Sequence, residues 1–232
     1  MSQEKEAKPG VYLKRVSDRM VLFDDRLQAG DFLAKEFSLL KPQPKDPIVL
    51  GIPRGGIPVG YRLAKSLASP LDTIVLRKLP IPANPEAGFG AVTLDRTVIF
   101  NQELLSFIQL DDDQIDQIIH DVYQEVLRRN QAYRKGRPFP SLEKRSVILT
   151  DDGLASGFTM LAAVKFVRKR KAGEVIVAVP VAHRQAYDLV RSESDRMVVL
   201  HISDAPYFAV ASFYRKFPDM SDQEVISYLE RP

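Results

Sequence analysis

The residue types best suited to do chemistry are concentrated between Val147 and Thr159, in the stretch VILTDDGLASGFT. Two adjacent acids, Asp151 and Asp152, follow a short apolar run and precede a tract of glycine and hydroxyl residues. The run 147–149 is typical of a buried strand, and the segment after Thr159 has helical periodicity with basic residues at its end. The stretch therefore predicts a strand, a loop and a helix that together form a ligand site.

Such a loop is suited to bind an anion, and phosphate above all. The first backbone N–H groups of a helix have no partner within it and lie at the positive end of its dipole. Gly153 and Gly157 allow a close backbone approach, while Ser156 and Thr159 add hydroxyl donors. Adjacent carboxylates repel each other unless they hold hydroxyls, a metal ion or a cationic partner. The alternative is a plain turn capped by Asp152 and Ser156, which needs fewer such residues than the loop supplies.

The composition is that of an ordinary globular protein. The 232 residues suit one large domain, or a core with an appended piece, and 45% are hydrophobic and 27% charged. No run approaches the roughly 20 apolar residues of a membrane span, and the polar start MSQEKEAKPG does not resemble a secretory signal, so a cytoplasmic location is expected. The absence of cysteine excludes disulfides, thiolate metal sites and Cys nucleophiles. A net charge of +3 suits an anionic small ligand as well as RNA.

A second loop with phosphate chemistry follows an earlier predicted strand. The pattern indicates a strand at 48–52, a helix at 59–67 and a strand at 72–76, which together make a β-α-β unit of a parallel sheet. The first strand ends in Pro53-Arg54-Gly55-Gly56. Ligands gather where parallel strands end, so this loop and the 147–159 stretch are expected at one rim. Arg54 could pair with phosphate oxygens; the alternative is a tight turn with a solvated arginine.

The strand at 72–76 leads into Arg77-Lys78 and then a segment rich in proline and glycine. An irregular loop is expected over residues 79–90, of the kind that often covers a binding site. Its polar members, Asn84 and Glu86, could meet a substrate or could equally be turn residues. Beyond it, residues 91–94 and 97–100 read as the arms of a hairpin.

Helical spacing predicts two further helices, one starting near Asp24 or Asp25 and one over about 111–135. At the start of the first helix, Asp24, Asp25 and Arg26 could form a polar site, but charges that favour a helix start are the better interpretation. The late basic cluster of the second could contact RNA, although charges that complement the helix dipole on a solvated face are the simpler reading: Arg128, Arg129, Arg134 and Lys135. His120 is expected to be packed rather than catalytic.

Strand and helix continue to alternate to the end of the core, with strands at 174–181 and 197–202 around a helix at 185–190. The fold class is therefore α/β. The remaining tail is aromatic and could cover the end of the sheet. Tyr207 and Phe208 follow a strand end and Pro206, where they are placed to stack on a flat ring or simply to cover the sheet.

These motifs resemble the type I phosphoribosyltransferases, and in particular a less studied predicted group of them. VILTDDGLASGFT matches the family's motif with one departure, Thr150 in place of an aliphatic residue, and the likeness extends from FDDRLQAG to PYFAVASFY, over about residues 23–225. It implies a central parallel sheet flanked by helices, with a small hood from the terminal segments. The expected division is a polar lead-in and start of the hood at 1–22, a core at 23–202, and an aromatic hood segment at 203–232.

The resemblance also implies roles. Asp151 and Asp152 would hold the ribose hydroxyls and a Mg²⁺ ion. The 5′-phosphate of phosphoribosyl pyrophosphate (PRPP) would lie in the loop formed by Gly153, Ala155, Ser156, Gly157, Phe158 and Thr159. The pyrophosphate would meet Arg54, Gly55 and Gly56, where relatives often have a cis peptide. Arg77, Lys78 and Glu86 would be catalytic, and Tyr207 and Phe208 would bind the acceptor.

The activity implied is Mg²⁺-dependent transfer of the 5-phosphoribosyl group from PRPP to a nucleobase or similar acceptor, with release of pyrophosphate. Relatives acting on 6-oxopurines have an Asp where this chain has Ala155, which leaves adenine-like, pyrimidine or unrelated acceptors open. Hydrolysis or phosphorolysis would use the same pocket. The alternative function is a PRPP- or nucleotide-sensing module that binds RNA or protein. Expected partners are PRPP, pyrophosphate, the acceptor and further copies of the chain, with membranes excluded and nucleic acid disfavoured.

Overall fold

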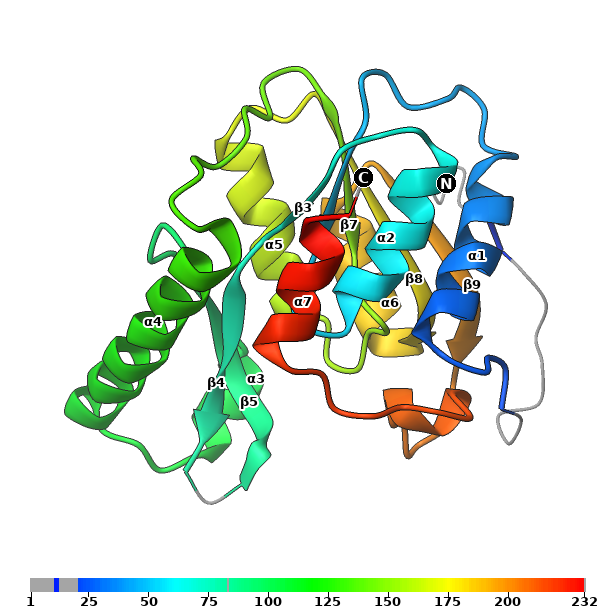
Figure 1. Ribbon diagram of the computed structural model, residues 1–232. Coiled ribbons are helices and arrows are strands. Elements are labelled where there is room, and N and C mark those ends of the chain that lie inside the picture. The colour runs from blue at the N-terminus through cyan, green and yellow to red at the C-terminus, as the bar shows by residue number, and fades with distance from the viewer. Residues whose placement is uncertain (1–10, 13–20, 83, 232) are drawn as a thin grey trace, which may run out of the picture.

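A computed structural model describes residues 11–12, 21–82 and 84–231 of the chain. Its main sheet has six parallel strands in the order β1-β9-β8-β7-β2-β3, drawn in Figure 1. Their bounds are β1 Val11–Tyr12, β2 Ile48–Gly51, β3 Leu71–Thr73, β7 Ser146–Thr150, β8 Glu174–His183 and β9 Arg196–Ser203. The chain thus has the α/β fold with a central parallel sheet that the alternating pattern predicts.

Helices cover both faces of this sheet (Figure 1). Because successive side chains of a strand point to opposite faces, Val49 and Ile148 face α1 (Arg26–Phe37) and α2 (Gly56–Ser66). Leu50 and Leu149 instead face α5 (Phe158–Lys169) and α6 (Arg184–Glu193). The strands are buried on both sides, which is why β2 and β7 read as continuous apolar runs.

A second sheet lies beside the first and corrects one expectation. Residues 79–90 do not form an irregular loop: β4 (Leu76–Ile81) and β5 (Asn84–Thr93) pair as an antiparallel hairpin despite their prolines. The irregularity appears instead as register shifts beside Leu79 and Pro80. β6 (Val98–Phe100) pairs with β5 around the predicted turn, so the hairpin over 91–100 is confirmed. The helix α3 (Gln102–Phe107) follows directly.

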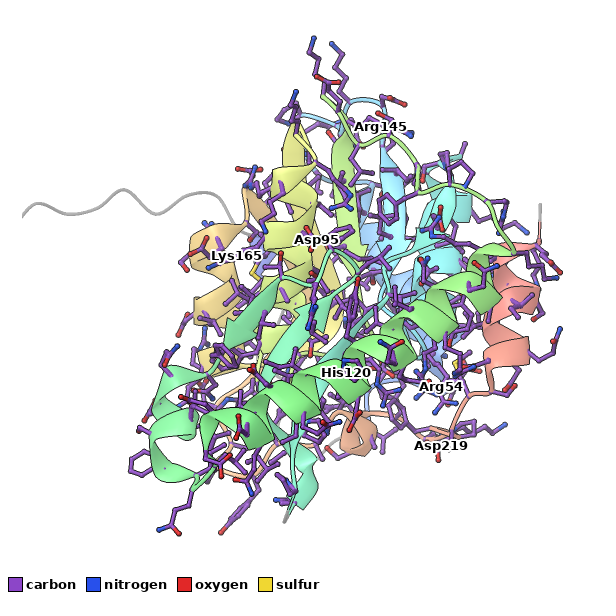
Figure 2. The ribbon with its side chains drawn as sticks, turned by 90° about the vertical axis from the view of Figure 1, so that its left-hand side faces the viewer. Arg54, Asp95, His120, Arg145, Lys165 and Asp219 are labelled. Atoms are coloured by element: carbon purple, nitrogen blue, oxygen red, sulfur yellow. The ribbon has the colours of Figure 1, made fainter. Side chains whose placement is uncertain are left out.

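Two helices join this second sheet to the core. The long predicted helix is confirmed as α4 (Asp112–Arg134), which packs along β4, and α7 (Asp222–Leu229) contacts both α4 and α2. The expectation that His120 is packed was wrong: it is exposed on the outer surface of α4 (Figure 2), because Ile119 takes the inward position next to it. Asp25 caps α1 by accepting from Gln28 N–H at 2.9 Å, as the acids at its start predict.

The first described strand, β1, lies at one edge of the main sheet, and the aromatic tail packs near β8. Most of the predicted lead-in, residues 1–10 and 13–20, lies outside the described residues, and β1 pairs with β9 in the main sheet. The aromatic tail carries a short 3₁₀ turn (Val210–Phe213), and Phe213 and Tyr214 pack on Phe23 and Val181. The assignment of the terminal segments to a hood stays a prediction. In the described ranges, no helix is long and apolar enough to cross a membrane.

Candidate active site

The two predicted phosphate loops lie side by side because the strands before them are neighbours. β2 and β7 pair in parallel, and Ile52 N–H donates to the Thr150 carbonyl at 2.9 Å. The contact is so close that a Cβ on Gly56 would lie 2.6 Å from that carbonyl oxygen. Glycine is therefore required here by backbone packing. The peptide between Pro53 and Arg54 is cis, as the resemblance implies.

The 151–157 loop is fixed in place by β8. Leu154 N–H donates to the Val181 carbonyl at 2.9 Å, and the Leu154 carbonyl accepts from His183 N–H at the same distance. Gly157 then caps α5 in the left-handed region, at φ 82°, where an L side chain is strained. Since α5 starts at Phe158, the N–H groups of its first turn have no partner within the helix. The loop thus presents a set of donors to any anion in front of it.

These donors line a cavity of about 340 Å³ that the second sheet closes from the other side. Lys78 of β4 and Gly88 and Gly90 of β5 face the loop across it. Asn101 also lines the cavity, and its Oδ1 accepts from Leu104 N–H at 3.1 Å as the cap of α3. Sequence reasoning missed Asn101; its place just after the predicted hairpin was the available signal. The remaining lining residues are Ala87, Leu104, Asp151 and 153–160.

The two adjacent acids have different surroundings. Asp151 lines the cavity, whereas Asp152 Oδ2 accepts from Arg26 Nε at 2.8 Å in a pair whose side chains are only 10% and 16% exposed. Burial raises the pKa of Asp151 well above its usual range, and the charge of Asp152 raises it further. Burial also raises the pKa of Asp152, which Arg26 opposes. A cation or hydroxyl donor at Asp151 would relieve this cost.

Arg26 is a functional candidate that the sequence offers only as the less favoured alternative, a polar site formed with Asp24 and Asp25. It follows the acids at the start of α1, where helix capping explained the charges sufficiently. Its Nη1 donates to the Pro218 carbonyl at 2.8 Å, and its guanidinium lies 3.7 Å from the centre of the Phe217 ring. The tail also reaches Asp152 directly, since Tyr214 donates its hydroxyl to the Asp152 carbonyl at 2.7 Å.

The basic residues predicted near pyrophosphate lie on different sides of their strand. Lys78 lines the cavity, while the preceding Arg77 points to α4, where its Nη1 lies 3.3 Å from Glu125 Oε1. Arg54 lies on the side of the molecule where α4 and α7 meet (Figure 2). Gly55, next to it, packs against the acids so closely that a Cβ would lie 1.8 Å from Asp152 Oδ2.

The basic cluster of α4 is engaged within the chain. Glu125 accepts from Arg128 at 2.6 Å and from Arg129 at 2.7 Å. Arg134 is buried and donates to Asp72 Oδ2 at 3.0 Å, and Lys135 pairs with Glu230. The cluster is therefore ion-paired within the chain rather than simply solvated; Arg128 and Lys135 stay more than half exposed, and contact with RNA stays an untested alternative.

The predicted acceptor residues do not lie together with the cavity lining. Tyr207 is 94% exposed. Phe208 packs in the aromatic tail, with its ring centre 5.7 Å from that of His183 and 5.4 Å from that of Phe213. Glu86 belongs to β5, but its side chain lies outside the described part of the structure. The acceptor and catalytic roles of these residues stay predictions.

The carboxylates at and beside the cavity suit a metal ion that binds together with a phosphorylated substrate. Among the described residues, no three side chains of His, Asp or Glu gather as a metal site. Mg²⁺ is commonly held by one or two carboxylates together with substrate phosphates and water, and Asp151 supplies one carboxylate to the cavity. Asp152 is the neighbouring carboxylate, and its Oδ2 already accepts from Arg26. The site therefore fits Mg²⁺ bound as a complex with a phosphorylated substrate.

Comparisons with known proteins agree with this geometry. The model of the phosphoribosyl transferase domain matches residues 23–212. Two provisionally named phosphoribosyl transferases of Mycobacterium tuberculosis, Rv0571c of strain H37Rv and MT0597 of strain CDC 1551, are 38% identical over 91% of this chain and 47% of theirs. The chain thus spans about half the length of these curated relatives. The crystal structure of TT1426 from Thermus thermophilus is 32% identical and superposes with a TM-score of 0.73, covering 90% of this chain and 97% of that one. The chain belongs to the phosphoribosyl transferase family, which is a family of transferase enzymes.

Proposed function

We propose that this chain transfers the 5-phosphoribosyl group from PRPP to a nucleobase or similar acceptor and releases pyrophosphate. The observation that carries the proposal is the cavity in which the N-terminus of α5, Asp151 and Lys78 face one another. An anion-binding helix start, a carboxylate and an ammonium group match the 5′-phosphate, the ribose hydroxyls and the pyrophosphate of one ligand.

Different parts of the protein are proposed to bind the 5′-phosphate, the ribose and the pyrophosphate of PRPP. The 5′-phosphate accepts from the N–H groups of the first turn of α5 and from the hydroxyls of Ser156 and Thr159. Asp151 accepts from a ribose hydroxyl. Lys78 of the cavity lining is proposed to meet the pyrophosphate, and the family resemblance adds Arg54, Gly55 and Gly56, which do not line the cavity themselves.

The reaction exchanges one bond at ribose C1 for another. The bond from C1 to a pyrophosphate oxygen breaks, the electron pair leaves with pyrophosphate, and C1 bonds to a nitrogen of the acceptor, which loses its proton. Glu86 is the candidate to receive that proton. Cationic groups at the leaving group stabilise the charge that develops there, so the protein acts chiefly by positioning and electrostatics. Bound Mg²⁺, held by Asp151 and substrate oxygens, would supply further neutralisation of the pyrophosphate.

The acceptor class follows from the loop. The side chain of Ala155 cannot hydrogen-bond a 6-oxopurine as an Asp there could, so an adenine-like, pyrimidine or unrelated acceptor is proposed. Tyr207 and Phe208 are the proposed stacking residues for it.

The test is to incubate the protein with PRPP and Mg²⁺, with and without a panel of bases, and to measure pyrophosphate. Acceptor-dependent release supports transfer, and release that needs no acceptor indicates hydrolysis. PRPP binding without release over a broad panel would contradict the proposal.

A further inference from the structure

The residue that holds Asp152 comes from a part of the chain distant from both phosphate loops. Arg26 lies 126 positions before it, at the start of α1, yet its Nε donates to Asp152 Oδ2 at 2.8 Å. We infer that Arg26 is a positioning residue of the PRPP site, an inference that rests on the proposed function. Arg26 fixes Asp152, so that Asp151 is the acid presented to the ribose.

The contacts form a continuous path from α1 to the cavity. Arg26 holds the carboxylate of Asp152, and Tyr214 holds its carbonyl at 2.7 Å. The remaining polar group of Asp152, its N–H, donates to Asp151 Oδ1 at 2.8 Å. That bond orients the carboxylate that lines the cavity, so a displacement of Asp152 displaces Asp151 too.

The Arg26 side chain is itself held in place by contacts with the C-terminal tail. Its guanidinium also donates to the Pro218 carbonyl and lies over the Phe217 ring. Gly55 lies beside this ion pair: a Cβ there would be 1.8 Å from Asp152 Oδ2 and 3.1 Å from Arg26 Nε, so the glycine is what leaves room for the paired carboxylate. A planar guanidinium that makes several directed contacts pre-organises its partner in a way that a flexible ammonium does not.

The charge of Arg26 also explains how two adjacent acids are tolerated at a ligand site. Two neighbouring carboxylates with no cation would repel each other and the phosphates of an incoming ligand. Arg26 pairs with Asp152 away from the cavity, so Asp151 is the acid left to meet a hydroxyl or cation of the ligand. The division predicts unequal roles for two residues that the sequence motif treats as equivalent.

A double-variant cycle tests this path, with PRPP binding measured by calorimetry in the presence and absence of Mg²⁺. Arg26→Met is expected to weaken PRPP binding about tenfold in the wild-type background and less than about twofold in an Asp152→Asn background, because its effect passes through Asp152. Asp151→Asn is expected to weaken binding more than Asp152→Asn. Arg26→Lys keeps the positive charge but loses the planar guanidinium, so its affinity for PRPP should fall between those of wild type and Arg26→Met.

The matched control is Arg62→Met, which removes an arginine of α2 that pairs with Asp31 of α1 on the exposed side of the same two helices. It should leave PRPP binding unchanged. If Arg26→Met does not fold, Arg26→Lys replaces it in both the wild-type and the Asp152→Asn backgrounds, because it keeps a positive charge beside Asp152 and so avoids an unpaired buried carboxylate.

Three results would overturn the inference: unchanged PRPP binding by Arg26→Met, an equal loss in both backgrounds, or a greater loss for Asp152→Asn than for Asp151→Asn. Wild-type protein that binds no PRPP would refute the proposed function itself, and the inference with it. Binding by wild type together with any of the three results would leave the proposed function standing.

Discussion

The left-handed glycine at the start of α5 allows the sharpest test of the phosphate loop. Gly157 has φ 82°, and a Cβ there would lie 3.2 Å from Ala186 Cα and O. Placing an L residue in this region costs about 1–2 kcal/mol. For a domain of this size, that cost predicts a melting temperature roughly 2–8 °C lower for Gly157→Ala. The tight contact of the new Cβ with α6 would lower the melting temperature further.

The functional effect is larger than the loss of stability suggests. To relieve its backbone, the variant must turn the peptide groups that lead into α5, and these carry the N–H donors of the loop. Losing one hydrogen bond to a charged phosphate costs about 1.5–3 kcal/mol, which is roughly a 10- to 150-fold loss of affinity. Calorimetric titration with PRPP and with ribose 5-phosphate would measure it, because both carry the 5′-phosphate.

The chain contains a matched control for the backbone term. Gly136 follows α4 at φ 80°, and a Cβ there would meet nothing within 4 Å. Gly136→Ala should therefore cost about the same 1–2 kcal/mol in the free energy of unfolding, by the same backbone strain, and leave both titrations unchanged. Wild-type affinity in Gly157→Ala would refute the assignment of the loop, and an unaltered melting temperature in Gly136→Ala would refute the magnitude.

Three further predictions concern residues around the cavity and α4. Lys78→Met should weaken binding of PRPP more than binding of ribose 5-phosphate, in the same titrations, while Lys65→Met on α2 changes neither. Glu125 has its pKa lowered to about 2, chiefly by its hydrogen bond with Arg128. The pKa of Glu125 is lower in the folded than in the unfolded state, so its contribution to stability is present above about pH 4.5 and is lost as the pH falls toward 2. The free energies of urea unfolding of wild type and Glu125→Gln should therefore differ at about pH 6 and converge near pH 2. Arg134→Met should cost about 3–5 kcal/mol in urea unfolding, because it leaves the Asp72 carboxylate without its buried partner, and a loss under about 1 kcal/mol would contradict that reading.

The parallel sheet could be predicted because local patterns determine it. Strands buried on both faces leave continuous apolar runs, and β2, β7 and β8 are of this kind. The second sheet could not be predicted in full, because proline and glycine in β4 and β5 are typical of loops. What overrides this preference is tertiary: Leu79 and Phe89 are completely buried in a cluster with Val126 of α4.

The candidate site divides in the same way. Residues 151–159 and 53–56 are recognisable because each loop follows a strand directly, and neighbouring parallel strands bring their ends together. Arg26 and Asn101 are harder to assign, although Asn101 also follows a strand. Each stands at a helix start, where capping or helix-dipole charge is the simpler interpretation, and only the packing of distant segments brings Arg26 to Asp152 and Asn101 to the cavity.

The same division of roles occurs in two pairs of adjacent residues, Asp151-Asp152 and Arg77-Lys78. In each pair one member lines the cavity, Asp151 or Lys78, and the other is paired with a helix outside the motif. Arg77 and Lys78 separate because successive side chains of a strand point to opposite faces. The acids separate because Arg26 holds Asp152. Under the proposed function, each charge that faces the ligand has a neighbour paired with a helix, so α1 and α4 would support the site through residues that do not line the cavity.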